Sequence, residues 1–192
     1  LDSDIVAIYA DSVKKFSAWY FGKADYFPKH PFEFTDSLFL TDNGGIKDTL
    51  LFGSIPGATD NLDATFGETG LAAPPSPGTF DVRWLIPPTQ GTLLDFRNLM
   101  STDWVQNVYT CRLQPGPGGY PFTVRWNKNI FPSGSFFLRD AATHGGQFNV
   151  IMKIQSTYTI TNPSITQIEI VHISPVYYNF TQGWNIASIP LT

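Results

Sequence analysis

The sequence contains few charged residues, and none of its segments is strongly basic. Charged side chains make up 15% of the chain, against roughly 25% in an average globular domain. The net charge is −4, from 12 Lys and Arg and 16 Asp and Glu. Clustered cations supply most of the affinity for nucleic acid, so we expect no nucleic-acid partner. Because 42% of the residues are hydrophobic, the composition excludes a wholly disordered chain.

Cysteine is almost absent, since Cys111 is the single one and no disulfide can form within the chain. The sequence also lacks an apolar run of the roughly 20 residues that a membrane helix needs, so we expect no membrane span. Low charge with frequent Thr, Ser, Asn and Gly favours an extracellular or cell-surface location. The chain starts at Leu1 rather than Met, so we expect a removed leader or a fragment of a longer protein.

Aromatic and turn-forming residues are abundant instead: 15% of the chain is Phe, Trp or Tyr, with 16 Gly and 15 Pro. Short apolar or alternating segments recur roughly every ten residues, separated by turn signals, which is typical of an antiparallel β-sandwich. We therefore predict an all-β fold, an immunoglobulin-like or jelly-roll-like sandwich with extended terminal arms. A parallel α/β fold is excluded because strands do not alternate with helical patterns.

The expected strands follow from alternation and from Gly-, Pro- and Asn-rich turns such as 42–45 and 115–119. For 15–22 a helix over 11–21 is the competing prediction. We divide the chain into N-terminal strands or an arm (1–35), a sandwich core (36–173) and a C-terminal strand or arm (174–192). The expected strands are 4–10, 15–22, 31–41, 46–53, 80–86, 92–100, 104–114, 120–127, 135–140, 147–155, 158–162 and 165–174.

The longest irregular stretch, residues 53–79, holds the best candidates for chemistry. Asp60, Asp63 and Glu68 lie in this acidic loop, and calcium prefers several oxygen ligands of this kind. The alternative is a loop stabilised by Asx turns and backbone hydrogen bonds. The EF-hand pattern is absent, so calcium is a possible ligand and no other cofactor is expected.

No motif of a catalytic centre is present, and we predict that the protein is not an enzyme. His30, His144 and His172 have no metal-ligand spacing; we expect His144 in a turn and His172 packed in a strand. Cys111 is interpreted as a small buried hydrophobe. No G-x-S-x-G surrounds a serine. Paired carboxylates could serve a glycosidase, but sequence spacing does not place them.

The Trp and Tyr residues allow two interpretations. Exposed on a sandwich they stack on sugar rings, and the protein would then be a carbohydrate-binding or adhesive module with polysaccharide as partner. Buried, they fill the core and subunit contacts, which we favour. The residues concerned are Trp19, Tyr20, Trp84, Trp104, Tyr109, Trp126, Tyr177, Tyr178 and Trp184.

The C-terminal segment 176–192 is apolar and carries no charged residue. Such a terminal strand is an aggregation hazard unless it is paired. We therefore predict a structural protein that self-assembles with identical subunits into a fibre or tube. A terminal segment, 176–192 or alternatively 1–22, would add as a strand to a neighbour's sheet. The side chains expected in this contact are Tyr177, Phe180, Trp184, Ile186 and Ile189.

An ordered string of motifs supports an extracellular setting. The chain contains DSLFLTDNGGIKDTLLFG at 36–53, ATDNLD at 58–63, FGE at 66–68, APPSP at 73–77 and FDVRW at 80–84. LLDFR, GYPFTVRWN, FNVIMKIQS and TNP follow at 93–97, 119–127, 148–156 and 161–163. This string resembles a repeat domain of bacterial cell-surface proteins exported by type IX secretion. The resemblance implies a secreted β-sandwich module and no catalytic activity.

Overall fold

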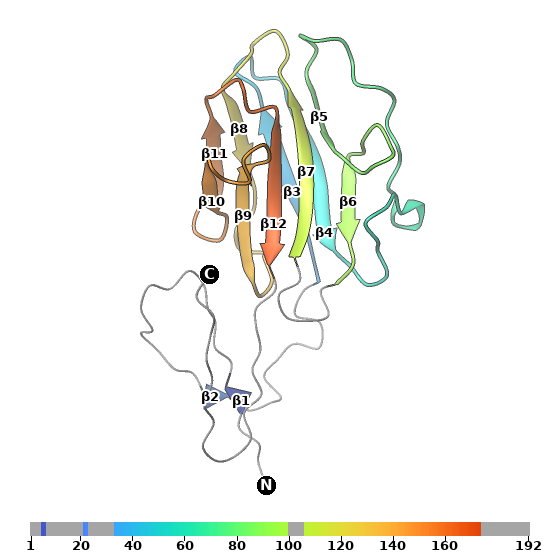
Figure 1. Ribbon diagram of the computed structural model, residues 1–192, viewed down its shortest axis with the longest axis vertical. Helices are drawn as coiled ribbons and strands as arrows, with labels where there is room; N and C mark the ends of the chain where they lie inside the picture. The colour runs from blue at the N-terminus through green and yellow to red at the C-terminus, as the bar shows by residue number, and fades with distance from the viewer. Residues whose placement is uncertain (1–4, 7–20, 23–32, 100–105, 174–192) are drawn as a thin grey trace.

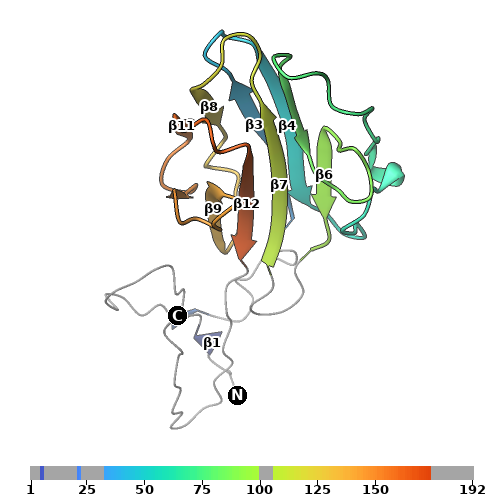
Figure 2. The ribbon, with the colours of Figure 1, turned by 45° about the horizontal axis from the view of Figure 1, so that its top comes forward.

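Two five-stranded sheets pack face to face in the computed structural model (Figures 1 and 2). The structure describes residues 5–6, 21–22, 33–99 and 106–173. This architecture confirms the predicted all-β sandwich. Within these residues the one helix is the three-residue 3₁₀ turn η2 (Ala64–Phe66), and no helix has the length and apolar character needed to span a bilayer.

The first sheet, which we call the β3 sheet, has the strand order β11-β8-β3-β4-β6. Its neighbouring strands pair antiparallel, except that β4 and β6 run parallel. Its edges are therefore β6 and β11. The strands are β3 (Phe34–Thr41), β4 (Lys47–Ser54), β6 (Leu94–Arg97), β8 (Phe122–Arg125) and β11 (Thr157–Ile160).

The second sheet, the β12 sheet, has the order β10-β9-β12-β7-β5 and is antiparallel throughout. Its edge β5 lies on the same lateral side of the sandwich as β6, and its edge β10 on the same side as β11 (Figure 1). The strands are β5 (Asp81–Trp84), β7 (Gln106–Gln114), β9 (Ser135–Asp140), β10 (Asn149–Ile151) and β12 (Gln167–Ile173).

Alternation of side chains places the core between the sheets, as the sequence predicts. On β8 and just after it, Phe122, Val124 and Trp126 are 0%, 0% and 4% exposed, while Arg125 between them is exposed. The central strand β12 is buried on both faces, since Ile170 and Val171 are both fully buried. An apolar run thus marks a central strand, and strict alternation marks a strand with one solvent face.

Several strands are shorter than their predicted ranges, among them β5, β6, β8 and β10, and two of these show a physical reason. The strand predicted over 92–100 begins only at Leu94, because the backbone of Thr92 pairs with Trp84 of the other sheet. The strand predicted over 147–155 is confined to Asn149–Ile151, because a turn follows in which the Ile154 N–H donates to the Ile151 carbonyl. In both places the chain leaves its sheet early to reach the opposite one.

Near the N-terminus, β1 (Ile5–Val6) pairs antiparallel with β2 (Phe21–Gly22). Both lie inside segments that the sequence analysis expects as strands, 4–10 and 15–22. The alternative helix over 11–21 falls almost wholly on residues outside the described part. The predicted C-terminal arm, 174–192, also lies outside the described residues.

The two glycine turns expected at 42–45 and 115–119 are present, and they dock on each other. Asp42 accepts hydrogen bonds from the Ile46 and Gly116 N–H groups, both at 3.0 Å, and is 4% exposed. A Cβ atom built on Gly118 would lie 2.1 Å from the Gly44 nitrogen and 2.3 Å from its Cα. Gly118 therefore allows a backbone-to-backbone approach that no other residue permits.

Replacing Gly118 with alanine should lower the free energy of unfolding by about 1–3 kcal/mol, because one of the two turns must shift. Urea denaturation monitored by tryptophan fluorescence measures this change. Gly70→Ala is the matched control: a Cβ there would meet no atom within 4 Å, so we expect a change within about 0.5 kcal/mol. Equal losses in both variants would contradict the docking argument.

Candidate functional site

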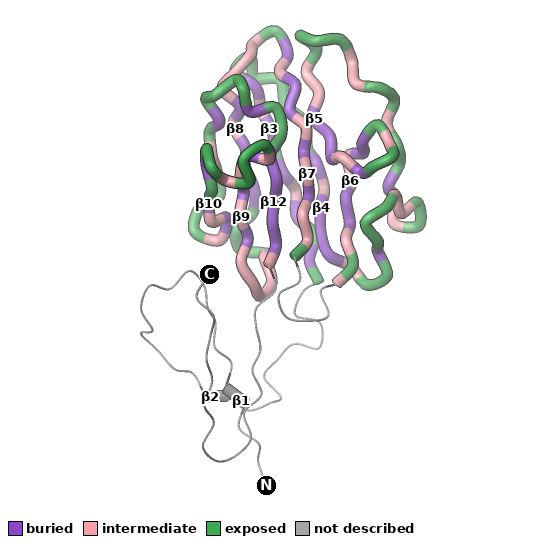
Figure 3. The backbone as a smooth tube through the Cα atoms, viewed as in Figure 1, coloured by how far each residue is buried: buried purple, intermediate pink, exposed green. Residues whose placement is uncertain are grey.

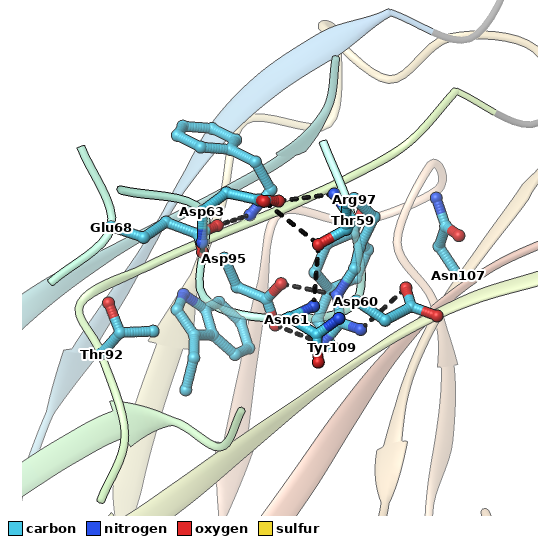
Figure 4. A network of polar contacts seen from close by, with 12 residues as sticks. Thr59, Asp60, Asn61, Asp63, Glu68, Thr92, Asp95, Arg97, Asn107 and Tyr109 are labelled. Atoms are coloured by element: carbon cyan, nitrogen blue, oxygen red, sulfur yellow. Dashed lines mark hydrogen bonds and ion pairs between the residues drawn. The ribbon is translucent and has the colours of Figure 1, made fainter. Parts of the chain in front are cut away.

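The predicted calcium loop lies along the side of the sandwich formed by β5 and β6. Its backbone is exposed over much of its length, while the strands beneath it are buried (Figure 3). Figure 4 shows the polar network that holds this loop to β6 and β7. Loops of this length are uncommon in a compact domain and often carry a function. The contacts of Asp60, Asp63 and Glu68 show how this loop is attached to the sandwich.

Glu68 fastens the loop to the edge strand β6. Its Oε1 accepts a hydrogen bond from the Phe96 N–H at 2.6 Å, and its Oε2 accepts one from the Asp63 N–H at 2.7 Å. The carboxylate is 2% exposed. Burial raises the pKa of Glu68, and the two N–H donors oppose that rise. The Glu68 side chain therefore occupies a backbone donor that β6 would otherwise offer to another strand.

The other two predicted ligands have different partners. Asp63 accepts hydrogen bonds from the N–H and the hydroxyl of Thr59, four residues earlier, at 2.5 and 3.1 Å, and the Thr59 hydroxyl accepts one from the Asn61 N–H in a Ser/Thr-type turn. Asp60, whose side chain is 83% exposed, pairs with Arg97 at 3.0 Å. Both contacts are made within the protein, and calcium as a ligand of this loop stays a prediction. Among the described residues, no group of three or more His, Cys, Asp or Glu could hold a metal ion.

Arg97 lies at the centre of the network, between the two sheets. It donates from Nε and NH2 to both carboxylate oxygens of Asp95, at 2.6 and 2.9 Å, and it lies 5.8 Å from the centre of the Tyr109 ring. Burial lowers the pKa of Arg97, but the hydrogen bonds and charges of Asp95 and Asp60 raise it above its ordinary value. Burial also raises the pKa of Asp95, and Arg97 opposes this. The network thus holds a permanent cation.

Tyr109 extends the network into the core from β7. Its hydroxyl donates to the Gly53 carbonyl at 2.9 Å and lies 3.1 Å from the Ser54 hydroxyl. Asn107 donates to the same Ser54 hydroxyl and to the Asn98 carbonyl. Burial raises the pKa of Tyr109 well above its ordinary value. These hydrogen bonds link both sheets and the loop, so the network is structural.

Thr92 closes the gap between the two sheet edges on this side. Its backbone N–H and C=O pair with Trp84 of β5, at 3.0 and 2.9 Å, and its hydroxyl accepts from the Leu94 N–H of β6. Arg83 holds the outer loop through the carbonyls of Ala72 and Gln90, at 2.7 and 2.9 Å. The β5–β6 side is therefore sealed by the chain's own residues.

The opposite side, formed by β10 and β11, is built differently. The Trp126 N–H donates to the Ser156 carbonyl, so these two residues form a hydrogen-bonded pair at the end of the β8–β11 ladder. Along an antiparallel ladder, hydrogen-bonded pairs alternate with pairs whose backbone groups point away from each other. With the register Tyr158↔Val124 and Thr159↔Thr123, the backbone N–H and C=O groups of Thr157 and Thr159 point away from β8. No other described segment hydrogen-bonds these four groups. They form an open edge on an uncharged strand.

The sequence analysis placed β11 but did not identify Thr157 and Thr159 as functional residues. The signal was available: STYTITN, residues 156–162, has high β-propensity and carries no charge, proline or glycine before Pro163. Natural edge strands are usually blunted by Lys, Pro or a bulge. An edge strand without these protections is one that another strand can extend.

The remaining predicted residues have clear positions where the structure describes them. Trp84, Tyr109 and Trp126 are buried, which confirms their assignment to the core. Cys111 is fully buried, as predicted, and burial raises the pKa of its thiol. The aromatics predicted at 19, 20, 104, 177, 178 and 184, the assembly residues of 176–192 and His30 lie outside the described residues.

Both described histidines match the sequence analysis. His144 lies in a turn with φ of 51° and is mostly exposed. His172 is fully buried on β12, where its ring stacks on Phe136 with centroids 3.9 Å apart. Burial lowers the pKa of His172 to about 3, although a hydrogen bond to the Ser133 carbonyl opposes this. His172 is thus a neutral core residue.

Comparisons with models of protein families, with curated proteins and with solved structures found no match to this chain. Among the described residues, the feature that points to a function is the contrast between the β5–β6 side, which the chain covers itself, and the β11 edge.

Proposed function

We propose that this protein is a structural subunit of an extracellular assembly. In this assembly, a terminal segment of one copy pairs as an additional strand with β11 of the next copy. The observation that carries the proposal is the difference between the two sides of the sandwich. Glu68, Thr92 and the loop seal the β5–β6 side, whereas on the other side no described segment hydrogen-bonds the outward backbone groups of Thr157 and Thr159.

The donor in this proposal is residues 176–192, the segment with Tyr177, Phe180, Trp184, Ile186 and Ile189. It carries no charge, so its backbone can approach the uncharged β11 edge without repulsion or loss of hydrated charge. Four outward backbone groups on β11 can form hydrogen bonds of about 0.5–1.5 kcal/mol each. Apolar donor side chains add burial to this. Because donor and acceptor are different surfaces, the contact is head-to-tail and propagates.

The extracellular setting rests on composition and on the resemblance to surface proteins exported by type IX secretion. In the structure, several of the quoted motifs contribute residues to the β5–β6 side. FGE contributes Glu68, FDVRW contributes Arg83 and Trp84, and LLDFR contributes Asp95 and Arg97. Glu68, Arg83 and Arg97 contact the long loop directly, whereas Asp95 pairs with Arg97 and Trp84 ties β5 to β4. Together they cover an edge that would otherwise be open to aggregation.

Replacing Thr159 with proline should abolish assembly or raise the critical concentration at least about tenfold, equivalent to 1.4 kcal/mol per contact. Proline removes the outward N–H and places its ring on the open edge, while the hydrogen-bonded pairs of β11 with β8 are kept. Sedimentation velocity and negative-stain electron microscopy of the full chain measure the effect. Deletion of residues 180–192, the donor side, should likewise give soluble monomers.

Thr159→Val is the matched control, because it keeps the N–H and the strand propensity and changes only the side chain. This variant should assemble like the unmodified protein. Thermal unfolding of Thr159→Pro, and of Thr157→Pro as a second edge variant, shows whether each remains folded. The proposal is overturned if a folded proline variant or the deletion variant assembles normally, or if the unmodified chain stays monomeric at all concentrations.

A further inference from the structure

A small cavity of about 190 Å³ lies on the outer side of the β12 sheet, where β9 ends and β12 begins. Segments far apart in sequence contribute to it: β7, the loop after β9, the loop before β12, and β12 itself. Its polar side chains carry hydroxyls, amides or carboxylates, and they include Thr110, Asp140, Gln147, Ser164, Gln167 and Glu169. None of these residues belongs to the network of the β5–β6 side or to the β11 edge.

Asp140 gives one wall of the cavity a fixed shape. Its carboxylate is fully buried and accepts hydrogen bonds from the N–H and hydroxyl of Thr143 and from the N–H groups of Gln147 and Phe148. Burial raises the pKa of Asp140, but these hydrogen bonds hold it well below its ordinary value. The loop is thus wrapped around a permanent carboxylate, which leaves Asp140 itself fully occupied.

The second wall is tied to the first by two further hydrogen bonds. The Ala141 N–H donates to the Gln167 carbonyl at 3.2 Å, and the Asn162 amide donates to Gln147 Oε1 at 2.8 Å. Asn162 also accepts from the N–H and hydroxyl of Ser164. Because both walls are fixed before any ligand arrives, binding would require little ordering of the protein.

Glu169 supplies an oriented acceptor with little net charge. Its Oε2 contacts Arg139 NH2 at 2.8 Å and Nε at 2.9 Å, and His144 lies 3.3 Å away. No described residue donates to Glu169 Oε1. The arginine neutralises the carboxylate and fixes its rotamer, so the remaining oxygen suits a neutral O–H donor better than a cation.

We propose that this cavity binds one neutral saccharide ring. Its volume is below the roughly 300 Å³ at which pockets for drug-sized molecules begin, which limits the ligand to a single small ring. The Thr110 hydroxyl and Glu169 Oε1, which have no hydrogen-bond partner among the described residues, match the donors and acceptors of sugar hydroxyls. The protein would then hold a glycan at a site separate from its assembly edge.

Saturation-transfer difference NMR with D-glucose, D-galactose, D-mannose and N-acetylglucosamine tests the proposal, with glycerol as reference. This method detects ligand binding to monomers and to assemblies alike, so its outcome is independent of the strand-addition proposal. We expect at least one sugar to bind with a dissociation constant on the order of 1 mM. Thr110→Val and Glu169→Gln should each weaken binding by at least about fivefold.

Thr49→Val, an exposed position on β4 in the other sheet, is the matched control and should bind unchanged. Thermal unfolding shows whether the cavity variants remain folded. The proposal is wrong if no sugar gives a signal above that of glycerol up to about 50 mM. It is also wrong if a sugar binds folded Thr110→Val and Glu169→Gln as tightly as the unmodified protein, because its site is then elsewhere.

Discussion

Replacing Arg97 with methionine should lower the free energy of unfolding by about 3–5 kcal/mol, the usual result of removing one partner from a buried ion pair. Asp95 has no exposed side-chain surface, and the Arg97 side chain is 11% exposed. Methionine fills a similar volume but donates no hydrogen bond, so the carboxylate is left buried and uncompensated. The loop also loses the ion pair that joins its Asp60 to Arg97 of β6. Urea denaturation of the folded monomer measures the change.

A double-mutant cycle separates the ion pair from simple packing. The double variant Asp95→Asn/Arg97→Met should be about 1–3 kcal/mol more stable than Arg97→Met, because it no longer buries an unpaired charge. Arg125→Met, at an exposed position on β8, is the matched control and should change stability by less than about 0.5 kcal/mol. Similar losses in the two arginine variants would show that Arg97 contributes no more than a surface residue.

The strands could be predicted from the sequence because their signals are local. One buried face of a strand is indicated by the alternation of apolar and polar residues, as at Phe122, Val124 and Trp126. Chain reversals are indicated by the glycine-rich turns at 42–45 and 115–119. The strand ends were less predictable. Thr92 pairs with Trp84 of the other sheet, and after the end of β10 the Met152 carbonyl accepts a hydrogen bond from Trp126, which follows β8 of the opposite sheet. The local sequence around Thr92 or Ile151 does not show which of these contacts forms.

The role of the acidic loop could not be read from the loop alone. Glu68 contacts Phe96, 28 residues further along the chain, and Asp60 contacts Arg97, 37 residues away. Carboxylates that accept backbone N–H groups and carboxylates that bind calcium have the same local sequence, rich in Asp, Asn and Gly. The two kinds of carboxylate differ in their surroundings in the folded protein. The first faces backbone N–H donors from distant segments, and the second faces other carboxylates.

The same limit applies to the open edge. Both β6 and β11 are short edge strands of one sheet. Two residues that precede β6 in the sequence, Thr92 and Glu68, accept hydrogen bonds from its outward N–H groups. No described residue near β11 in the sequence does the same for that strand. One edge is covered, and no described segment covers the other. This difference agrees with the proposed polymerisation in one direction, since two open sides would allow branched aggregation.

Acidification should stabilise the fold through Asp36, an aspartate of β3 that is 5% exposed. Burial raises the pKa of Asp36 from 3.8 to about 6, although hydrogen bonds from the Ser37 and Asn127 N–H groups oppose the rise. The folded protein therefore binds this proton more tightly than the unfolded chain. Its stabilising contribution is complete below the unfolded pKa and is lost as the pH rises through the folded pKa near 6.

The measurement compares the unmodified chain with Asp36→Asn at about pH 4 and pH 7 by urea denaturation. Other carboxylates also affect stability in this range, in both directions, so the informative quantity is the difference between the two proteins. The unmodified chain should gain roughly 2–3 kcal/mol relative to Asp36→Asn on acidification. Asp48→Asn, an exposed aspartate on the neighbouring strand β4, corrects for the removal of one carboxylate. The prediction is wrong if the difference in unfolding free energy between the unmodified chain and Asp36→Asn is the same at both pH values. Burial would then not raise the pKa of Asp36.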